Sequence, residues 1–175
     1  EVVVSAQSVG AVLVATWIHD YAPAIRGLVL ASPAFKVKLY VPLARPALAL
    51  WHRLRGLFFI NSYVKGRYLT HDRQRVASFN NDPLITRAIA VNILLDLYKT
   101  SERIIRDAAA ITLPTQLLIS GDDYVVHRQP QIDFYQRLRS PLKELHLLPG
   151  FYHDTLGEEN RAQAFEKMQS FISRL

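Results

Sequence analysis

The sequence predicts an α/β fold, a mostly parallel sheet covered by helices, with a helical block inserted between two strands. Short apolar runs typical of buried strands alternate with apolar helical segments. Near the amino end, the order is strand, small-residue turn, helix and strand, which is a parallel crossover. The chain has 175 residues, of which 50% are hydrophobic and 21% charged, so it is long enough for one domain with a sizeable core.

The first crossover is predicted from three segments. Val2-Val3-Val4 is expected to form a strand buried on both faces, because consecutive β-branched residues suit a covered sheet. An apolar helix is expected from about 11 to 20, and a second buried strand over 28–31. Both strands end in small residues. Because the crossover makes the strands parallel, their carboxyl ends are expected to lie at the same edge of the sheet.

The segment from about 34 to 110 predicts helices and loops. Its Leu- and Ala-rich run over 39–60 is interrupted by Pro42 and Pro46. Asp82-Pro83 predicts a helix start because Pro favours the first helical position, and apolar residues continue at helical spacing to Lys99. No linker separates this block from the rest, so we interpret it as a cap on a single domain.

The remaining elements return to the alternating α/β pattern. Strands are expected over 115–119 and 143–148, with a helix near 129–138 between them. An amphipathic helix is expected over 158–175. Its predicted apolar face comprises Ala162, Phe165, Met168, Phe171 and Ile172.

Composition excludes several classes of function. The absence of cysteine excludes disulfides, thiolate metal sites and a cysteine nucleophile, and it fits a reducing compartment such as the cytoplasm. The net charge of +6 is spread over helical segments rather than one dense run, which argues against nucleic-acid binding. His127 and Asp123 have no third ligand at a suitable spacing, so we expect neither a metal site nor a cofactor.

The first candidate for chemistry follows the first predicted strand. Ala6-Gln7-Ser8-Val9-Gly10 fits a nucleophile elbow, a tight strand-to-helix turn that needs small residues two positions before and after the serine. The alternative is an ordinary helix start capped by Ser8.

Two further candidates follow later predicted strands. Asp122-Asp123 could supply a carboxylate that orients a histidine, and His153 could transfer protons. Each alone also fits an ordinary turn or a polar loop histidine. Together with Ser8, they follow the chain order Ser, Asp, His, which is the α/β-hydrolase order.

These motifs resemble the monoacylglycerol lipase and lysophospholipase (serine aminopeptidase-like) family of α/β-hydrolases. Gly-Asp-Asp-Tyr-Val-Val at 121–126 is similar to the family's acidic loop and selects Asp123, and Gly-Phe-Tyr-His at 150–153 is similar to its Gly-x-Tyr-His. Asn-Asp-Pro-Leu at 81–84, with Arg87, resembles part of its cap.

A narrower resemblance concerns the runs 16–36 and 82–102. They are similar to bacterial hydrolases often fused to an S-adenosylmethionine-dependent methyltransferase. Nothing resembles the methyltransferase half, so that cofactor is not assigned.

The resemblance implies a carboxylic ester hydrolase acting on a monoacylglycerol or lysophospholipid. Ser8 would be the nucleophile, His153 the general base and Asp123 its orienting carboxylate. The backbone N–H of Val9 would bind the oxyanion. Amide substrates stay open as an alternative to esters.

The resemblance covers only the later part of a complete hydrolase domain. The missing part contains a His-Gly loop that supplies a second oxyanion donor, and one such donor is worth ~2.7–4 kcal/mol of barrier. A non-catalytic binding or assembly module is therefore the alternative function. Val2–Val4 would also form an unpaired edge, so we expect a longer polypeptide, a completing chain or a homo-oligomer, and the start at Glu1 favours the first.

The predicted cap combines apolar residues with arginines. Trp51 and Phe58 are candidates for lining an acyl pocket above Ser8, although much of this run also fits ordinary core. Arg45, Arg53 and Arg55 would face anionic headgroups, which implies peripheral membrane contact through the cap. No run of ~18–20 apolar residues predicts a membrane span.

Overall fold

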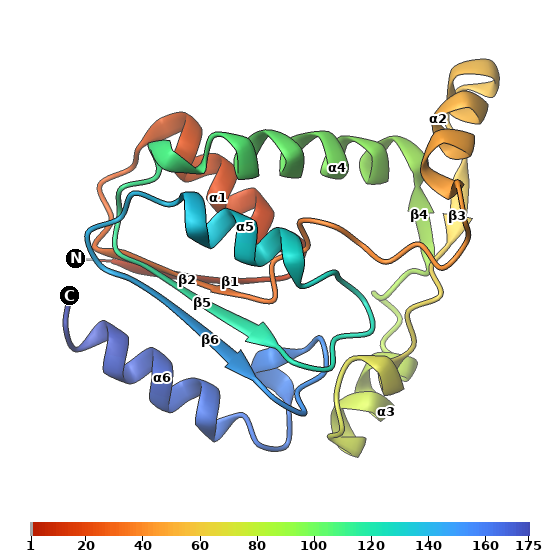
Figure 1. Cartoon of the computed structure of the whole chain (residues 1–175). Helices are drawn as coiled ribbons and strands as arrows, with labels where there is room; N and C mark the ends of the chain where they lie inside the picture. The colour runs from red at the N-terminus through yellow and green to blue at the C-terminus, as the bar shows by residue number, and fades with distance from the viewer. Residues whose placement is uncertain (1) are drawn as a thin grey trace.

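The computed structural model describes residues 2–175, so the prediction about Glu1 lies outside the described residues. Its main sheet has four parallel strands in the order β1-β2-β5-β6 (Figure 1). The strands are β1 (Val3–Gln7), β2 (Gly27–Ala31), β5 (Thr115–Ser120) and β6 (Lys143–Leu148). The predicted α/β class with a parallel sheet is confirmed.

Helices cover both faces of the sheet (Figure 1). One face carries α1, α4 and α5, and the other carries α6. Their bounds are α1 (Val9–Tyr21), α4 (Val91–Arg106), α5 (Gln129–Arg137) and α6 (Ala162–Ile172).

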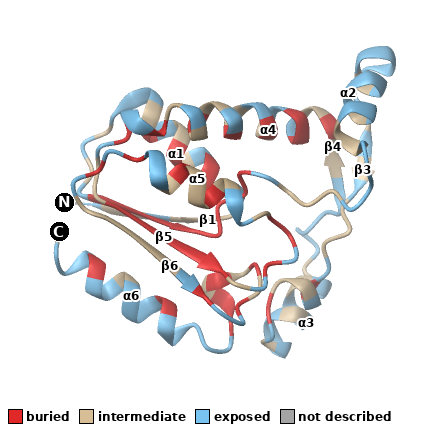
Figure 2. Ribbon diagram, in the orientation of Figure 1, coloured by how far each residue is buried: buried red, intermediate tan, exposed pale blue. Residues whose placement is uncertain are grey.

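The two central strands divide their apolar side chains between these layers. Leu28 and Leu30 of β2 join the core under α1, whereas Val29 and Ala31 join the core under α6. Successive strand side chains point to opposite faces, so a strand covered on both sides must be apolar throughout. Figure 2 shows β5 as a buried strand between the layers.

The first strand differs from its prediction. It runs from Val3 to Gln7 rather than over Val2–Val4, and it pairs within the described residues with β2 alone. Val3 and Val4 are half-buried and Ser5 is exposed. Both faces are covered as predicted, since Val4 packs against the core under α1 and Val3 against the core under α6. The predicted full burial is wrong, because β1 forms an edge of this sheet.

A long insertion, residues 32–114, connects β2 to β5. It contains α2 (Ala44–Arg55), β3 (Phe59–Asn61), the 3₁₀ turn η1 (Gly66–Tyr68), α3 (Arg73–Asn81), β4 (Ala88–Ala90), α4 and η2 (Ala108–Ala110). Strands β3 and β4 pair antiparallel. The part from α2 to β4 lies beyond the carboxyl ends of the main strands (Figure 1). In contrast, α4 packs against α1 and α5 over the sheet.

Two predicted helix boundaries are wrong. Asp82 ends α3, its carboxylate accepts the N–H of Leu84 at 2.9 Å, and α4 begins only at Val91 because residues 88–90 pair with β3. The last helix begins at Ala162 rather than 158.

The face of α6 is also shifted from its prediction. Its buried residues are Ala164 and Phe171, with Met168 half-buried, whereas Phe165 and Ile172 are exposed. The spacing from 164 to 168 to 171 is equally helical, which explains the ambiguity.

Within residues 2–175, no helix combines the length and the apolar character needed to cross a membrane.

Candidate active site

The turn between β1 and α1 holds Ser8 in an unusual backbone conformation. Its φ of 56° and ψ of −124° lie where non-glycine residues are strained. Hydrogen bonds fix this backbone: the Ser8 N–H donates to the Ala31 carbonyl at 3.0 Å, and the Ser8 carbonyl accepts from Ala34 at 3.0 Å. The end of β2 therefore holds the serine in a sharp turn, as an elbow requires.

The nucleophile elbow predicts that only a small residue fits at position 10, but the structure shows no contact that would exclude a larger one. A Cβ at Gly10 would meet no heavy atom within 4 Å among the described residues. The prediction assumed a crowded turn, but the turn follows an edge strand and lies in open space on that side.

The acidic loop after β5 positions one carboxylate. Asp123 Oδ1 accepts the N–H groups of Val125 at 2.7 Å and Val126 at 2.9 Å. The loop is held in turn by residues after β2, since the Lys38 N–H donates to the Val125 carbonyl at 2.8 Å. Oδ2 of Asp123 is thus aimed by backbone donors, whereas the neighbouring Asp122 is more accessible to solvent.

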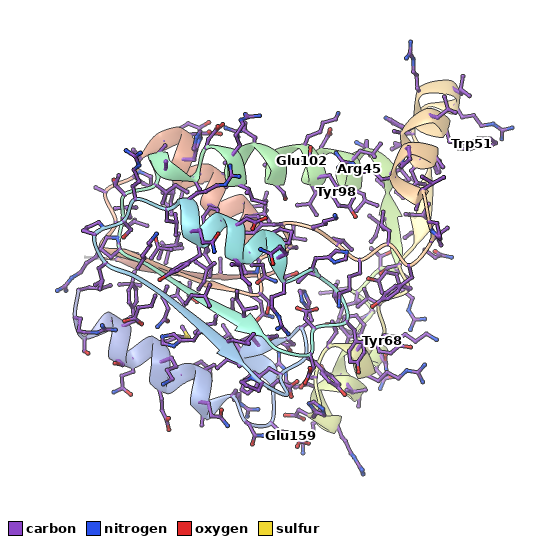
Figure 3. All side chains as sticks on the ribbon, in the orientation of Figure 1. Arg45, Trp51, Tyr68, Tyr98, Glu102 and Glu159 are labelled. Atoms are coloured by element: carbon purple, nitrogen blue, oxygen red, sulfur yellow. The ribbon has the colours of Figure 1, made fainter. Side chains whose placement is uncertain are left out.

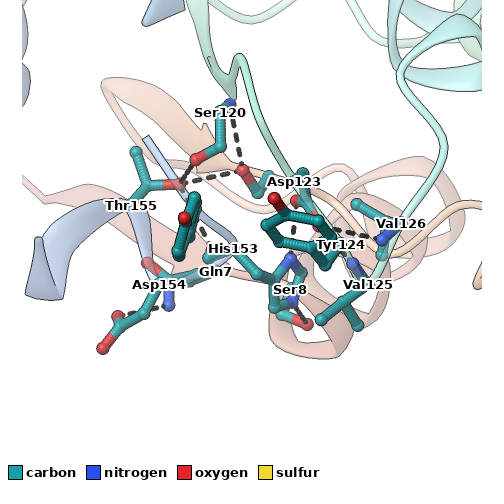
Figure 4. Close-up of polar contacts among 12 residues, drawn as sticks. Gln7, Ser8, Ser120, Asp123, Tyr124, Val125, Val126, His153, Asp154 and Thr155 are labelled. Carbon is teal, nitrogen blue, oxygen red and sulfur yellow. Dashed lines mark hydrogen bonds and ion pairs between the residues drawn. The ribbon is translucent and has the colours of Figure 1, made fainter. Parts of the chain in front are cut away.

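His153, in the loop after β6, lies between that carboxylate and the serine (Figure 4). Its Nδ1 is 2.7 Å from Asp123 Oδ2, and its Nε2 is 2.7 Å from Ser8 Oγ. His153 is 5% exposed and Asp123 8% exposed, so water competes little for this contact. The structure brings together all three side chains predicted from the sequence.

This geometry sets the direction of the two hydrogen bonds to His153. The carboxylate can only accept, so His153 must donate through Nδ1 and present Nε2 as the acceptor for the Ser8 hydroxyl. Val9 is the first residue of α1. The N–H groups of a first helical turn have no partner within the helix, so Val9 can donate to an anion beside Ser8.

Three buried hydroxyls beneath the histidine loop were not predicted. Thr155 Oγ1 lies 2.8 Å from Ser32 Oγ and 2.9 Å from Ser120 Oγ, so these two contacts join the loop to the ends of β2 and β5 (Figure 4). Their distance in sequence, up to 123 residues, conceals the cluster.

Glu158 was also not predicted. This buried carboxylate accepts the N–H groups of Tyr152 at 2.8 Å and His71 at 3.0 Å. It therefore joins the insertion to the loop that carries His153.

The insertion and Tyr124 line an open cavity of about 990 Å³. Trp51 and Phe58 line it, as do Tyr68 and Tyr124, while Ser8 and His153 do not (Figure 3 labels Trp51 and Tyr68). Tyr124 directly follows Asp123, so the cavity adjoins the acidic loop. The other lining residues are Leu39, Tyr40, Val41, Ala44, Ala47, Leu48, Ile60, Asn61, Tyr63 and Lys65.

Charges around this cavity are partly paired. Arg45 forms an ion pair with Glu102, and its guanidinium lies 4.9 Å from the Tyr98 ring centroid (Figure 3). Arg45 is therefore paired within the chain while its side chain stays partly exposed. Burial, and next the Asp123 charge, raise the pKa of the Tyr40 phenol above its ordinary value.

Within residues 2–175, no cluster of three or more His, Asp or Glu side chains is arranged to hold a metal.

Comparison with known proteins places these features in context. The family model described as serine aminopeptidase, S33, matches residues 1–160. YnbC of Escherichia coli (strain K12) is 98% identical over 175 residues, which are 100% of this chain and 30% of YnbC. Phospholipase YtpA of Bacillus subtilis (strain 168) is 24% identical over 173 residues, covering 95% of this chain and 66% of YtpA. The chain thus spans less than a third of YnbC.

A solved structure shares the fold. The monoacylglycerol lipase of Paleococcus ferrophilus superposes with a TM-score of 0.87 at 18% identity, over 99% of this chain and 68% of that chain.

Proposed function

Since the chain belongs to the serine aminopeptidase (S33) family and is an α/β-hydrolase of the monoacylglycerol lipase and lysophospholipase type, we propose that it cleaves carboxylic esters with a Ser-His-Asp triad. Ser8 is the nucleophile and His153 the general base and acid. Asp123 orients the imidazole, and the Val9 N–H binds the oxyanion. The observation that carries this proposal is the continuous contact from Ser8 Oγ through His153 to Asp123, with both links at 2.7 Å.

The reaction follows from that contact. As Ser8 Oγ attacks the ester carbonyl, its proton passes to Nε2 of His153, and the carbonyl oxygen becomes an oxyanion beside the Val9 N–H. When the ester C–O bond breaks, the imidazolium returns the proton to the leaving alcohol. Water then attacks the acyl-serine, again losing a proton to His153, and releases the carboxylic acid and Ser8.

A long-chain glycerol ester is the substrate class that we propose. The cavity is lined mainly by apolar and aromatic side chains and is large enough for an acyl chain. The names of two similar proteins, a phospholipase and a monoacylglycerol lipase, concern the same class of ester. Phe58→Ala should raise KM for monooleoylglycerol but not for p-nitrophenyl butyrate. Phe59→Ala is the matched control, because Phe59 is exposed and does not line the cavity.

Peripheral membrane contact through α2 is part of the proposal. This helix has no buried residue (Figure 2). Leu50 and Leu54 are exposed along it, and Leu43 is exposed at its N-cap. Arg53 and Arg55 lie in its last turn, so an apolar face and basic groups are available to an anionic bilayer. Leu50→Glu with Leu54→Glu should reduce co-sedimentation with phosphatidylglycerol vesicles. The control is Leu84→Glu, at an exposed position outside α2.

We also propose that the β1 edge pairs with another polypeptide segment, which belongs to a longer polypeptide, a completing chain or a second copy. Helix α1, which follows and contacts β1, has exposed apolar residues at a spacing of four: Val9, Leu13, Trp17 and Tyr21. A purified chain should therefore form a dimer or bind a completing chain. Leu13→Glu with Trp17→Glu should return it to monomer by light scattering.

Hydrolysis by the purified chain tests the central proposal. We expect turnover of p-nitrophenyl butyrate and monooleoylglycerol that is lost in Ser8→Ala and kept in Ser5→Ala, a matched change at an exposed β1 serine. Faster cleavage of the corresponding amides would favour a peptidase instead.

The alternative is a non-catalytic binding or assembly module. It is motivated by the oxyanion site, to which only the Val9 N–H is assigned within residues 2–175. Lipid binding without turnover would support that alternative.

A further inference from the structure

Gln7 and Asp154 are hydrogen bonded to each other beside the proposed triad. Gln7 directly precedes Ser8, and Asp154 directly follows His153. Gln7 Nε2 donates to Asp154 Oδ1 at 2.9 Å (Figure 4). Gln7 Oε1 accepts the N–H of Leu156 at 3.2 Å. A second link thus runs from the serine turn to the histidine loop, next to the contact between the reacting side chains.

The other side of the Asp154 carboxylate is also held. Its Oδ2 accepts from Arg75 of α3 at 2.9 Å, and the Asp154 N–H donates to the Leu69 carbonyl at 2.7 Å. A Cβ at Gly157 would collide with both the Asp154 carboxylate and the Arg75 guanidinium. This ion pair is therefore seated tightly against a glycine, and it fixes the orientation in which Asp154 meets Gln7.

We infer that Gln7 and Asp154 are positioning residues, which hold Nε2 of His153 within hydrogen-bonding distance of Ser8 Oγ. The inference rests on the proposed function. Neither side chain touches the reacting atoms, but each belongs to the residue next to one that does. A misplacement of about 1 Å can cost ~10²-fold in rate, so a link at this place affects the chemistry directly. An ordinary surface contact would affect folding stability alone.

Gln7→Glu separates these two roles. The variant keeps the size of the side chain and its acceptor for Leu156, but it replaces the donor to Asp154 by a second carboxylate. We expect the rate of Ser8 acylation by a fluorophosphonate to fall by roughly tenfold or more. Adding Asp154→Asn should restore the rate to within about threefold, because the introduced amide would then donate to the introduced carboxylate and reverse the polarity of the link.

The chain offers a matched control on α5. Gln129 Nε2 donates to Asp133 Oδ1 at 2.8 Å, in an exposed pair whose residues are not adjacent in sequence to any member of the proposed triad. Gln129→Glu makes the same chemical change to the same kind of pair. It should leave the acylation rate unchanged. Thermal midpoints for all variants detect a loss of folding.

Two results would overturn the inference. One is Gln7→Glu reacting at the wild-type rate, and the other is the double variant remaining as slow as Gln7→Glu at an equal thermal midpoint. The His153 ring signals in ¹H–¹⁵N NMR give a readout that needs no reaction. They should broaden or shift in Gln7→Glu and return in the double variant, and unchanged signals would contradict the link. Failure of wild-type acylation at Ser8 with these NMR changes present would refute the proposed function alone.

Discussion

Asp123→Asn is the substitution whose outcome the geometry fixes most completely. Oδ1 of Asp123 accepts two backbone N–H groups, from Val125 and Val126. In the variant, those donors require the amide oxygen at that place, so the NH₂ group must face Nδ1 of His153. Nδ1 then becomes an acceptor and Nε2 carries the proton. The imidazole can no longer accept the proton of Ser8.

The expected loss is large because the wrong tautomer removes the general base. The corresponding change in a serine protease triad lowers kcat by ~10⁴, and each tenfold step corresponds to ~1.36 kcal/mol of barrier. We therefore expect the rate of p-nitrophenyl butyrate hydrolysis to fall by ~10³–10⁴, or ~4–5.5 kcal/mol. The assay is kcat at saturating ester, with the thermal midpoint measured alongside.

Asp122→Asn is the matched control. Asp122 is the adjacent aspartate and does not contact His153, and it changes in charge and size in the same way. Its substitution should change kcat by less than about twofold. A loss below tenfold in Asp123→Asn, or equal losses in both variants, would refute the proposed role of Asp123.

Three further predictions concern stability. Gly121→Ala would place a Cβ 2.8 Å from the Leu148 carbonyl oxygen, a backbone atom that cannot move freely, so urea unfolding should show a loss of ~1–3 kcal/mol. Phe134→Ala removes a fully buried ring and should cost ~3–5 kcal/mol, and a loss below about 1 kcal/mol would contradict the packing. Hydrogen bonding to Arg103 lowers the pKa of Asp20 below its ordinary value. Asp20→Asn should therefore lower the thermal midpoint slightly at pH 7. The difference in midpoint between wild type and variant should shrink below about pH 4, because Asp20 of the unfolded chain is then protonated, and at still lower pH Asp20 of the folded chain is protonated too.

The strands of the main sheet could be predicted because their patterns are local. The segment 115–119 ends in the apolar run Leu-Leu-Ile before Ser-Gly-Asp-Asp, and β6 occupies the predicted 143–148. Each polar side chain of the proposed triad follows one of the strands of this sheet. Since parallel strands end at the same edge, a common location could be expected from chain order alone.

The insertion was harder to predict because its structure depends on pairing within the block. Asp82-Pro83 has the composition of a helix start, but the short antiparallel pairing of β3 with β4 takes residues 88–90. The prediction that β1 is fully buried was wrong for a similar reason. Three valines indicate a strand, but they do not indicate whether a neighbouring strand pairs with each of its edges.

The contacts that support the proposed triad are long-range and could not be predicted. Gln7 and Asp154 lie 147 residues apart, and the carboxylate of Glu158 meets Thr70 and His71 from the insertion. Glutamine, aspartate and glutamate are common on exposed loops, so their residue types carried no signal. Only adjacency to Ser8 and His153 marked Gln7 and Asp154 in advance.

Mapping a covalent adduct tests the central claim most directly. The purified chain is treated with a fluorophosphonate, digested, and analysed by mass spectrometry for the modified serine. We predict one adduct on Ser8, absent in His153→Ala at an unchanged thermal midpoint. An adduct on another serine, or no adduct on a folded chain, would contradict the assignment of Ser8 as the nucleophile.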